Sequence, residues 1–294
     1  MPWLISPAQL DKFRKNQKNV LIFDASWHLP TENRLPHEEF ATKHIVGARF
    51  FDLELFHENQ NPLPNMLVRD INYIQQKMSE LGISNDQKII FYDQSDLHSS
   101  CRAVWMFKVF GYNPNQLYIL DGGLRAWEMY GGKIESGESK TSTNKSCTIN
   151  FESHFVRTLI QMKNNLSHPA EQVVDMRHAV RFAGGPEIRK GIRSGHIPGS
   201  FSFPYTTMFE LDGRFKPLER IRKQITGIGV DLSYPIVTMC GSGITASILN
   251  FVLDIMNHNQ HALYDGSWAE WGAEQLFTGE RSLDERPLIR SVDM

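Results

Sequence analysis

The 294-residue chain repeats itself, and this internal duplication is the feature that most constrains its fold. Four segments of the first half recur in the same order in the second half, at offsets between 144 and 152 residues. The matched pairs are residues 20–24 with 172–175, 44–48 with 196–200, 88–93 with 235–240, and 117–123 with 262–267. A series of ordered matches at a nearly constant offset predicts two tandem copies of one domain.

Each copy alternates short apolar runs with amphipathic stretches of helical length. The helices expected from this pattern include residues 71–81, 103–110 and 244–256. Short buried strands that alternate with helices are typical of a parallel sheet covered by helices on both faces. The sequence therefore predicts an α/β fold with two domains, residues 1–136 and 151–294. Residues 137–150 form the predicted linker, because this segment is rich in Ser, Thr and Lys and has no apolar period.

Composition and charge argue against several classes of partner. Hydrophobic residues make up 41% of the chain and charged residues 22%, which is typical of a globular protein. The net charge is −2 and no long basic run occurs, so neither nucleic acid nor an anionic membrane is indicated as a partner. No stretch approaches the ~20 apolar residues needed to span a bilayer. The first residues lack the basic-then-apolar layout of a signal peptide, and we expect a cytoplasmic protein.

The three cysteines, Cys101, Cys147 and Cys240, are far apart in the chain and odd in number. Their spacing indicates neither a disulfide framework nor a metal site, and we expect no cofactor. A reducing compartment fits this pattern and would keep a functional thiol free. Cys101 and Cys147 are interpreted as structural, because neither lies in a loop like the one that begins at Cys240.

Cys240 stands between a buried strand and an apolar helix, at the start of a loop of small residues. The loop consists of Cys240, Gly241, Ser242, Gly243, Ile244 and Thr245. Ligands of parallel α/β sheets bind at the carboxyl ends of the strands. A Gly- and Ser-rich loop that enters a helix can turn its N–H groups inward, and these groups, together with the positive helix end, stabilise an anion. Such surroundings favour the thiolate of a cysteine, so Cys240 is the candidate nucleophile.

These elements resemble those of the rhodanese-type sulfurtransferases over nearly the whole chain. The resemblance rests on the Cys240 loop, on His196-Ile197-Pro198-Gly199, on Asp121-Gly122-Gly123-Leu124 and Asp265-Gly266-Ser267-Trp268, and on the two-copy layout. Within that group, Cys-Gly-Ser-Gly-Ile-Thr is similar to the 3-mercaptopyruvate sulfurtransferase loop, whose usual form is Cys-Gly-Ser/Thr-Gly-Val-Thr. Residues 24–27, Asp-Ala-Ser-Trp, are similar to the N-terminal signature of the same enzymes.

The resemblance implies an enzyme that moves sulfur from 3-mercaptopyruvate through a persulfide on Cys240, releasing pyruvate. The implied acceptor is thioredoxin, a small thiol or cyanide. It also implies that Arg181 and Arg189 bind the donor carboxylate, which suits the two-pronged pairing of guanidinium with carboxylate. The implied substrate-binding loop residues are Gly241, Ser242, Gly243, Ile244 and Thr245. Asp93 stands at the matching position of the first copy, so that domain is expected to be non-catalytic.

Three other functions are alternatives to this one. A cysteine phosphatase would need Arg at position 246, where this chain has Ala246, and is rejected because the phosphoryl group would lose its clamp. A thiosulfate sulfurtransferase is the first alternative, although its members place basic residues just after the cysteine, and Gly241 and Ser242 carry no charge. A non-catalytic persulfide carrier or interaction protein is the second, since it would also need Cys240.

Two positions depart from the family pattern. Asn65, in Pro-Asn-Met-Leu, replaces a common His, and Glu54, in Phe-Phe-Asp-Leu-Glu, replaces an Asp. Asn65 cannot carry charge or act as an acid or base, so a mechanism with an Asp–His relay is in doubt for this chain. His44 and His196 recur at matched positions in both copies and are interpreted as structural turn residues. The same interpretation covers the repeated strand-end residues Asp24, Asp121, Asp175 and Asp265.

Overall fold

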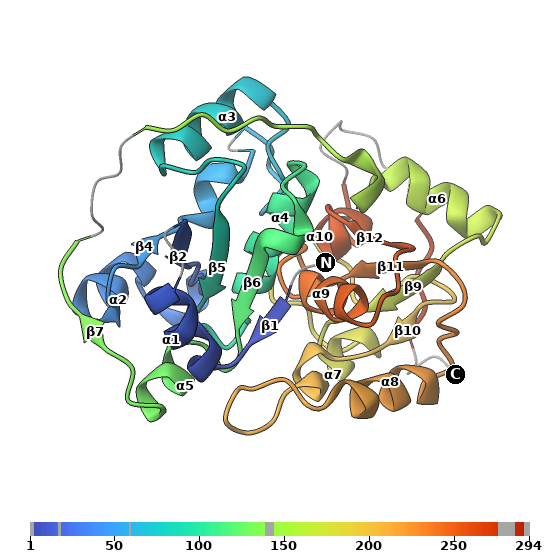
Figure 1. Cartoon of the computed structure of the whole chain (residues 1–294). Coiled ribbons are helices and arrows are strands. Elements are labelled where there is room, and N and C mark those ends of the chain that lie inside the picture. The colour runs from blue at the N-terminus through green and yellow to red at the C-terminus, as the bar shows by residue number, and fades with distance from the viewer. Residues whose placement is uncertain (1–2, 17–18, 59, 139–143, 276–285, 291–294) are drawn as a thin grey trace. The chain divides into compact units, whose positions relative to one another are not determined.

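The structure is a computed structural model that describes residues 3–16, 19–58, 60–138, 144–275 and 286–290 (Figure 1). Its contacts divide the chain into two compact units. The first unit comprises Met1–Phe56, Val68–Glu152 and Phe209–Phe215, and the second comprises His57–Leu67, Ser153–Met208 and Lys216–Met294. Residues 139–143 of the predicted linker lie outside the described residues. The domain limits drawn from the sequence stay a prediction.

Each unit is built on one five-stranded sheet, and both sheets are parallel throughout. The first sheet has the order β1-β6-β5-β2-β4 and the second has β8-β12-β11-β9-β10. The strands of the first sheet are β1 Trp3–Ile5, β2 Val20–Asp24, β4 Arg49–Phe50, β5 Lys88–Tyr92 and β6 Leu117–Leu120. The strands of the second are β8 Val156–Arg157, β9 Gln172–Asp175, β10 Phe201–Ser202, β11 Ile236–Met239 and β12 His261–Tyr264. Strand for strand, the two orders are the same, so the duplication seen in the sequence is a duplication of topology.

Helices follow the strands in both units (Figure 1). The first unit contains α1 Pro7–Asn16, α2 Pro36–Thr42, α3 Ile71–Glu80, α4 Ser100–Val109 and α5 Gly123–Met129. The second contains α6 Leu159–Ser167, α7 Ala179–Phe182, α8 Leu218–Gly227, α9 Ala246–Ile255 and α10 Ser267–Trp271. The short elements are β3 His44–Ile45 and β7 Ile134–Glu135, which pair antiparallel, and the 3-10 turns η1 Pro30–Glu32, η2 Leu53–Phe56, η3 Pro114–Gln116, η4 Ser153–Phe155 and η5 Tyr205–Met208. The helices predicted near 71–81, 103–110 and 244–256 are confirmed as α3, α4 and α9.

The first sheet is buried on both faces. Successive side chains of a strand point to opposite sides, so each strand contributes to two cores. Ile90 of β5 packs in one core with Leu10 of α1 and Trp127 of α5. Its neighbour Phe91 points the other way and contacts Phe107 of α4, with ring centroids 5.0 Å apart. Full burial of one such side chain contributes about 1.5–3 kcal/mol, which accounts for the near-continuous apolar run of β5.

The second sheet is covered in the same manner. Val237 and Met239 of β11 pack against Trp268 and Trp271 of α10. On the opposite side α9 packs against β11 and β12, and there the contacts include polar groups. The side-chain amide of Asn250 in α9 donates to the hydroxyl oxygen of Thr238 and contacts the His261 ring. These directional contacts fix the position of α9 on the strand that leads to Cys240. Of the helices in the described ranges, none is both long and apolar enough to cross a membrane.

The two halves of the chain exchange short hairpins. Residues His57–Leu67, from the first half, pack within the second unit, and Phe209–Phe215, from the second half, pack within the first. Each hairpin is held by the Asp that follows the fourth matched strand. Asp265 accepts the Leu67 N–H at 2.9 Å, and Asp121 accepts the Phe215 N–H at 2.9 Å. Asp121 and Asp265 therefore bind exchanged backbone, a role that their local sequence does not indicate, whereas Asp24 and Asp175 accept the N–H two residues further on, as predicted for turn residues.

Substitution of Asp121 by Ala should loosen the Phe209–Phe215 hairpin. The Phe215 N–H would lose its acceptor, and an unsatisfied buried donor costs about 1–3 kcal/mol. Trypsin should then cut after the half-exposed Arg214 about 5- to 100-fold faster than in the parent protein, as followed by mass spectrometry of the fragments. Asp121→Asn keeps an acceptor oxygen and is the control. Equal cutting rates in all three proteins would show that this contact does not hold the hairpin.

Candidate active site

Cys240 follows the last residue of β11 and lies at the carboxyl edge of the second sheet. Its side chain is buried, with 3% of the residue exposed. Gly243 adopts the left-handed backbone conformation, φ 83°, which glycine enters without steric cost. The turn at this glycine brings the Gly243 N–H to 3.2 Å from Cys240 Sγ. The loop therefore points a backbone donor at the sulfur, an arrangement that favours negative charge on it.

The loop is fixed from behind by the segment that joins β12 to α10. The Trp268 N–H donates to the Cys240 carbonyl at 3.0 Å, and the Ala269 N–H donates to the Gly241 carbonyl at 2.9 Å. Ser267 Oγ accepts the Cys240 N–H at 3.2 Å and donates to the Tyr264 carbonyl at 2.8 Å. Ser267 itself has φ 50°, which is uncommon for a residue with a side chain. These bonds leave the backbone around Cys240 little freedom to move.

Arg181 and Arg189 both lie against this loop, and their binding of a donor carboxylate stays a prediction. A side chain built at Gly241 would place its Cβ 3.5 Å from Arg181 Nη1 and 3.7 Å from Arg189 Nη1. Both guanidinium groups therefore lie within van der Waals reach of the residue next to Cys240. Arg189 Nη1 also donates to the Gly241 carbonyl at 3.0 Å. The structure thus brings Arg181, Arg189 and the Cys240 loop together.

The two arginines differ in how their charge is balanced. Arg181 donates through Nε and Nη2 to both carboxylate oxygens of Glu187, at 3.1 and 2.6 Å, and Arg177 holds the same carboxylate at 3.0 Å. Among the described residues no carboxylate forms an ion pair with Arg189. Burial lowers the pKa of Arg189, whereas the nearby Cys240 sulfur acts in the opposite direction. Arg189 is thus a partly buried cation close to the Cys240 sulfur.

The remaining side chains of the loop, Ser242, Ile244 and Thr245, are all buried. Ser242 Oγ accepts a hydrogen bond from Asn65 Nδ2 at 2.7 Å, and Thr245 precedes α9 without capping it through its side chain. The first N–H groups of α9 are therefore not satisfied by a side-chain cap, and the positive end of this helix faces the loop.

Comparison with known proteins identifies this arrangement. A family model described as the rhodanese-like domain matches residues 6–130 and again residues 158–274. The chain belongs to the rhodanese-like family. The double match confirms two tandem rhodanese-like domains, and the predicted α/β fold is confirmed with it.

Named relatives refine the identification. The Arabidopsis thaliana protein named thiosulfate/3-mercaptopyruvate sulfurtransferase 1, mitochondrial, is 36% identical over 279 residues, which cover 88% of this chain and 73% of that protein. The mouse protein named 3-mercaptopyruvate sulfurtransferase is 36% identical over 267 residues, covering 90% and 89%. The crystal structure of SseA from Escherichia coli matches with a TM-score of 0.81 at 30% identity, covering 91% of this chain and 99% of that one. The chain is a sulfurtransferase of the rhodanese type, similar to 3-mercaptopyruvate sulfurtransferases.

The first rhodanese-like domain has a carboxylate at the position that corresponds to Cys240. Asp93 stands after β5, where Cys240 stands after β11. One of its carboxylate oxygens accepts the Ser100 N–H at the start of α4 at 2.8 Å, and the other accepts the Ser95 N–H at 3.2 Å. The loop amides of this domain thus bind a carboxylate from their own chain. The Asp93 side chain thus lies where the loop of this domain would bind an anion, and the expected lack of catalysis there stays a prediction.

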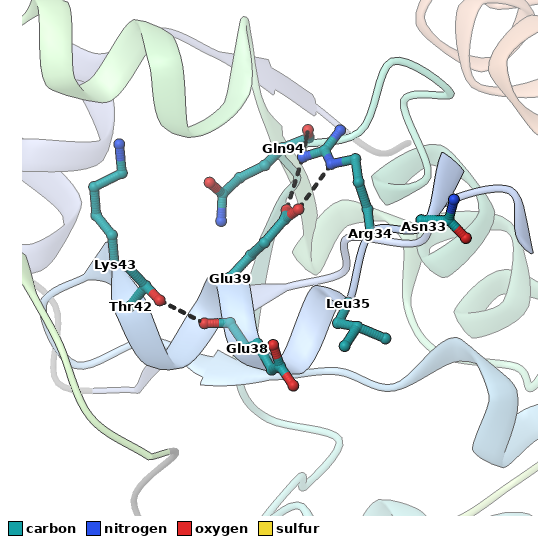
Figure 2. Close-up of a pocket in the computed structure, with 8 residues that line it drawn as sticks. All are labelled: Asn33, Arg34, Leu35, Glu38, Glu39, Thr42, Lys43 and Gln94. Carbon is teal, nitrogen blue, oxygen red and sulfur yellow. Dashed lines mark hydrogen bonds and ion pairs between the residues drawn. The ribbon is translucent and has the colours of Figure 1, made fainter. Parts of the chain in front are cut away.

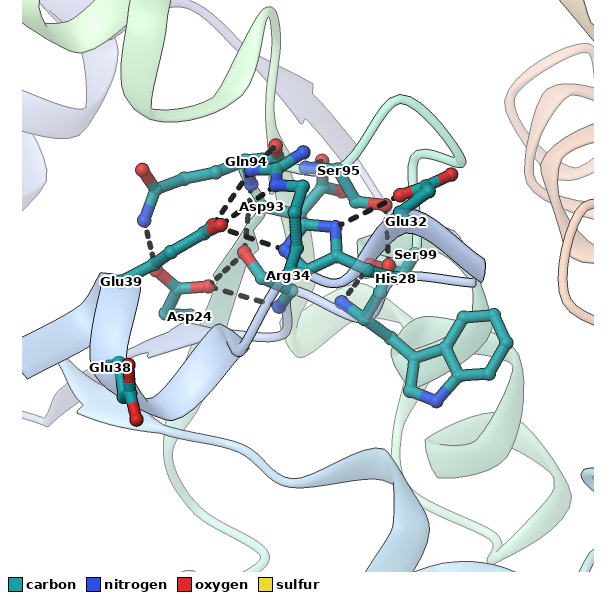
Figure 3. A network of polar contacts seen from close by, with 12 residues as sticks. Asp24, His28, Glu32, Arg34, Glu38, Glu39, Asp93, Gln94, Ser95 and Ser99 are labelled. Carbon is teal, nitrogen blue, oxygen red and sulfur yellow. Dashed lines mark hydrogen bonds and ion pairs between the residues drawn. The ribbon is translucent and has the colours of Figure 1, made fainter. Parts of the chain in front are cut away.

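The neighbourhood of Asp93 repeats the arginine contact of the second domain, with one difference. Arg34 donates to the Gln94 carbonyl at 3.1 Å, as Arg189 donates to the Gly241 carbonyl. Figure 3 shows that Arg34 also pairs with Glu39, through two hydrogen bonds of 2.7 Å, and that His28 contacts the same carboxylate. Here the arginine already has an internal partner.

A pocket of about 390 Å³ opens beside this network in the first domain (Figure 2). It is lined by Asn33, Arg34, Leu35, Glu38, Glu39, Thr42, Lys43 and Gln94. Arg34 is paired with Glu39, and Lys43 lies 2.8 Å from Glu128. Both cations of this wall therefore already face a carboxylate, in contrast to Arg189.

The matched histidines have the same contacts in both domains. His44 Nδ1 lies 2.7 Å from the Phe40 carbonyl, and His196 Nδ1 lies 2.8 Å from the Phe182 carbonyl. Each ring also stacks on the phenylalanine whose carbonyl it binds, with centroids 3.9 and 3.8 Å apart. Both histidines are thus held by a helix end and pack as structural residues, as their repetition indicated.

The other two cysteines are set apart from the loop. Burial raises the pKa of Cys101 well above its usual value, and it raises the pKa of Cys147 to about 11. Neither is therefore a thiolate at neutral pH, in agreement with the structural interpretation. In the described part of the chain, no group of three or more His, Cys, Asp or Glu side chains is placed to hold a metal ion.

The sequence does not indicate the roles of three residues of the site. Glu187 orients Arg181, Ser267 holds the Cys240 N–H, and Asn65 binds Ser242. Asn65 was noted only as a departure from the family pattern. Glu187 lies six residues after Arg181, close enough that a search for acids near the arginines would find it. The contacts of Ser267 and Asn65 span 27 and 177 residues and leave no local signal.

Asp24 should make the stability of the first domain depend on pH. It is fully buried, and this burial raises its pKa to about 6, although hydrogen bonds from Ser26 and Gln94 act in the opposite direction. A raised carboxyl pKa adds stability below the unfolded value near 4, and this stability is lost as the pH rises through about 6. Asp24→Asn, which stays neutral, should therefore gain about 3 kcal/mol relative to the parent between about pH 4 and pH 7.

Urea unfolding at several pH values measures this difference. Asp175→Asn is the matched control, because Asp175 pairs with the buried Arg177 at 2.7 Å and its loss should destabilise at neutral pH. A constant difference between Asp24→Asn and the parent across this range would contradict the assignment.

Proposed function

We propose that this protein transfers sulfur from 3-mercaptopyruvate to a thiol acceptor, with Cys240 as the carrier of a persulfide. The observation that carries the proposal is the meeting of Arg189 and Arg181 at Gly241, one residue from the buried thiol. Guanidinium groups pair with carboxylates in a planar, two-pronged geometry. A carboxylate bound there would hold the donor sulfur close to Cys240 Sγ.

In the first step the Cys240 thiolate attacks the sulfur of the donor. A sulfur–sulfur bond forms, the carbon–sulfur bond of the donor breaks, and its electron pair passes to the carbon skeleton, which takes up a proton and leaves as pyruvate. The Gly243 N–H, directed at Sγ, and the first turn of α9 would stabilise the negative charge of the persulfide. Gly241, Ser242, Gly243, Ile244 and Thr245 form the substrate-binding loop in this proposal, and no cofactor takes part.

In the second step an acceptor thiolate attacks the outer sulfur of the persulfide and restores the Cys240 thiolate. Thioredoxin or a small thiol would serve, and cyanide would accept the same sulfur as thiocyanate. The expected cytoplasmic location stays a prediction. Both steps need an approach path to a cysteine that is only 3% exposed, and the partly exposed Gly241 and Arg181 lie on that path.

Thiosulfate is the second candidate donor. The Arabidopsis relative carries both donors in its name, and a pair of arginines also suits a small dianion. The residues directly after Cys240 carry no charge, however, which favours the carboxylate donor. Turnover of the two donors at matched concentrations distinguishes these alternatives.

Intact-mass analysis after incubation with 3-mercaptopyruvate tests the carrier role. The parent protein should gain the mass of one sulfur atom, located on the peptide that contains Cys240. Cys240→Ser should gain none, should lose transfer, and should unfold at the same temperature as the parent. Cys147→Ser is the control and should gain sulfur normally, because burial keeps Cys147 protonated. Sulfur found on another peptide, or on Cys240→Ser, would rule out the carrier role.

Arginine substitutions test the carboxylate site. Arg189→Ala and Arg181→Ala should each raise KM for 3-mercaptopyruvate by about 10- to 100-fold, the effect of a lost charge-assisted hydrogen bond. Any turnover of thiosulfate should fall less. Arg222→Ala, on the exposed side of α8, is the control and should leave both donors unaffected. Equal losses on both donors would contradict a carboxylate clamp.

A further inference from the structure

The contact between Asn65 and Ser242 joins distant parts of the chain inside the second compact unit. Asn65 Nδ2 lies 2.7 Å from Ser242 Oγ, and both residues are buried, with 9% and 5% exposed. The amide nitrogen can only donate, so the serine oxygen is the acceptor. A serine hydroxyl that accepts from one partner keeps its own proton available for another.

The position of Asn65 is set by the hairpin His57–Leu67. The Glu58 N–H donates to the Met66 carbonyl at 2.7 Å, which closes the hairpin around Asn65. Two residues after Asn65, the Leu67 N–H is bound by the buried Asp265. Asn65 itself has φ 62°, a left-handed conformation that asparagine tolerates better than most residues. The amide is thus delivered to Ser242 by a segment anchored next to the Cys240 loop.

Ser242 lies between Gly241, which the arginines contact, and Gly243, whose N–H points at Cys240 Sγ. The charged and titratable groups near this part of the loop include Cys240, Arg181, Arg189 and Glu187, and Asp265 binds the hairpin at Leu67. The Ser242 hydroxyl could donate a hydrogen bond to the Cys240 sulfur or to the bound donor. The site otherwise offers backbone N–H groups and guanidinium groups, so an oriented hydroxyl adds another donor to the same anion.

We propose that Asn65 is a positioning residue that fixes Ser242 as a hydrogen-bond donor to the anion held at Cys240. This role rests on the proposed sulfur transfer. It explains how the site functions with an amide at position 65. An amide does not titrate at physiological pH, so Ser242 keeps the same polarity over the whole working range. A proton relay through residue 65 is not part of this mechanism.

The substitution Asn65→Asp tests the polarity of this contact. Aspartate has nearly the same shape but lacks the N–H, so its carboxylate would accept the Ser242 proton and turn the donor away from the loop. We expect kcat to fall by about 10- to 100-fold, with a similar fall in Ser242→Ala. The double variant should be no slower than the slower single variant, because both changes remove one interaction. Additive losses would overturn the proposal.

Asn61→Asp is the matched control, in the same hairpin. The Asn61 side-chain oxygen accepts the Leu63 N–H, which an aspartate would also do, so this variant should keep the parent kcat. Thermal unfolding of every variant reports whether the hairpin still folds. A loss of kcat in Asn61→Asp equal to that in Asn65→Asp would assign the effect to added charge.

The substitution Asn65→His provides a second test if Asn65→Asp does not fold. Imidazole can donate, so activity should be largely retained, but its titration near pH 6.5 should add a step to the pH profile of kcat that the parent lacks. A profile that superimposes on that of the parent would overturn the proposal. Sulfur loading of the parent by 3-mercaptopyruvate, read by mass, separates the two ideas. If the parent loads and Asn65→Asp turns over at the parent rate, only the role of Asn65 fails, whereas a parent that does not load contradicts the proposed function itself.

Discussion

The backbone N–H groups of a loop between a strand and a buried helix need an acceptor, and this requirement shapes both halves of the molecule. In the first domain the acceptor is covalently attached, because Asp93 turns its carboxylate onto the amides of Ser95 and Ser100. In the second domain Cys240 stands at that place and a sulfur atom receives the Gly243 N–H. The duplicated fold thus directs backbone N–H groups at the side chain that follows the central strand in both copies.

The arginine next to the loop also differs between the two domains. Arg34 is paired with Glu39 and needs no ligand, whereas Arg189 donates to a carbonyl and faces the thiol. A partly buried cation without a carboxylate partner reduces stability, and an anion that enters the site relieves this penalty. In the proposed function this cost lies at the site of sulfur transfer. Arg181 and Arg177, by contrast, share the Glu187 carboxylate.

The duplication and the α/β alternation could be predicted from the sequence because both are local or periodic signals. The strand before Cys240 and the helix after it lie where the apolar pattern indicated, and glycine at positions 241 and 243 indicated a tight loop. The hairpin exchange could not be predicted, because it depends on contacts between Asp265 and Leu67 and between Asp121 and Phe215. Aspartate at the end of a strand looks the same whether it caps its own turn or binds a distant N–H group.

The roles of residues 54 and 65 also depend on their hydrogen-bond partners. Glu54 Oε1 accepts a hydrogen bond from Trp27 Nε1 at 3.2 Å in the first domain, which occupies that oxygen. Asn65 binds Ser242 in the second domain. A histidine at position 65 could exchange a proton with the serine, whereas an amide can only hold it in one orientation. Because thiolate attack on sulfur requires charge stabilisation at the loop and not proton transfer from Ser242, an orienting amide is sufficient for this chemistry.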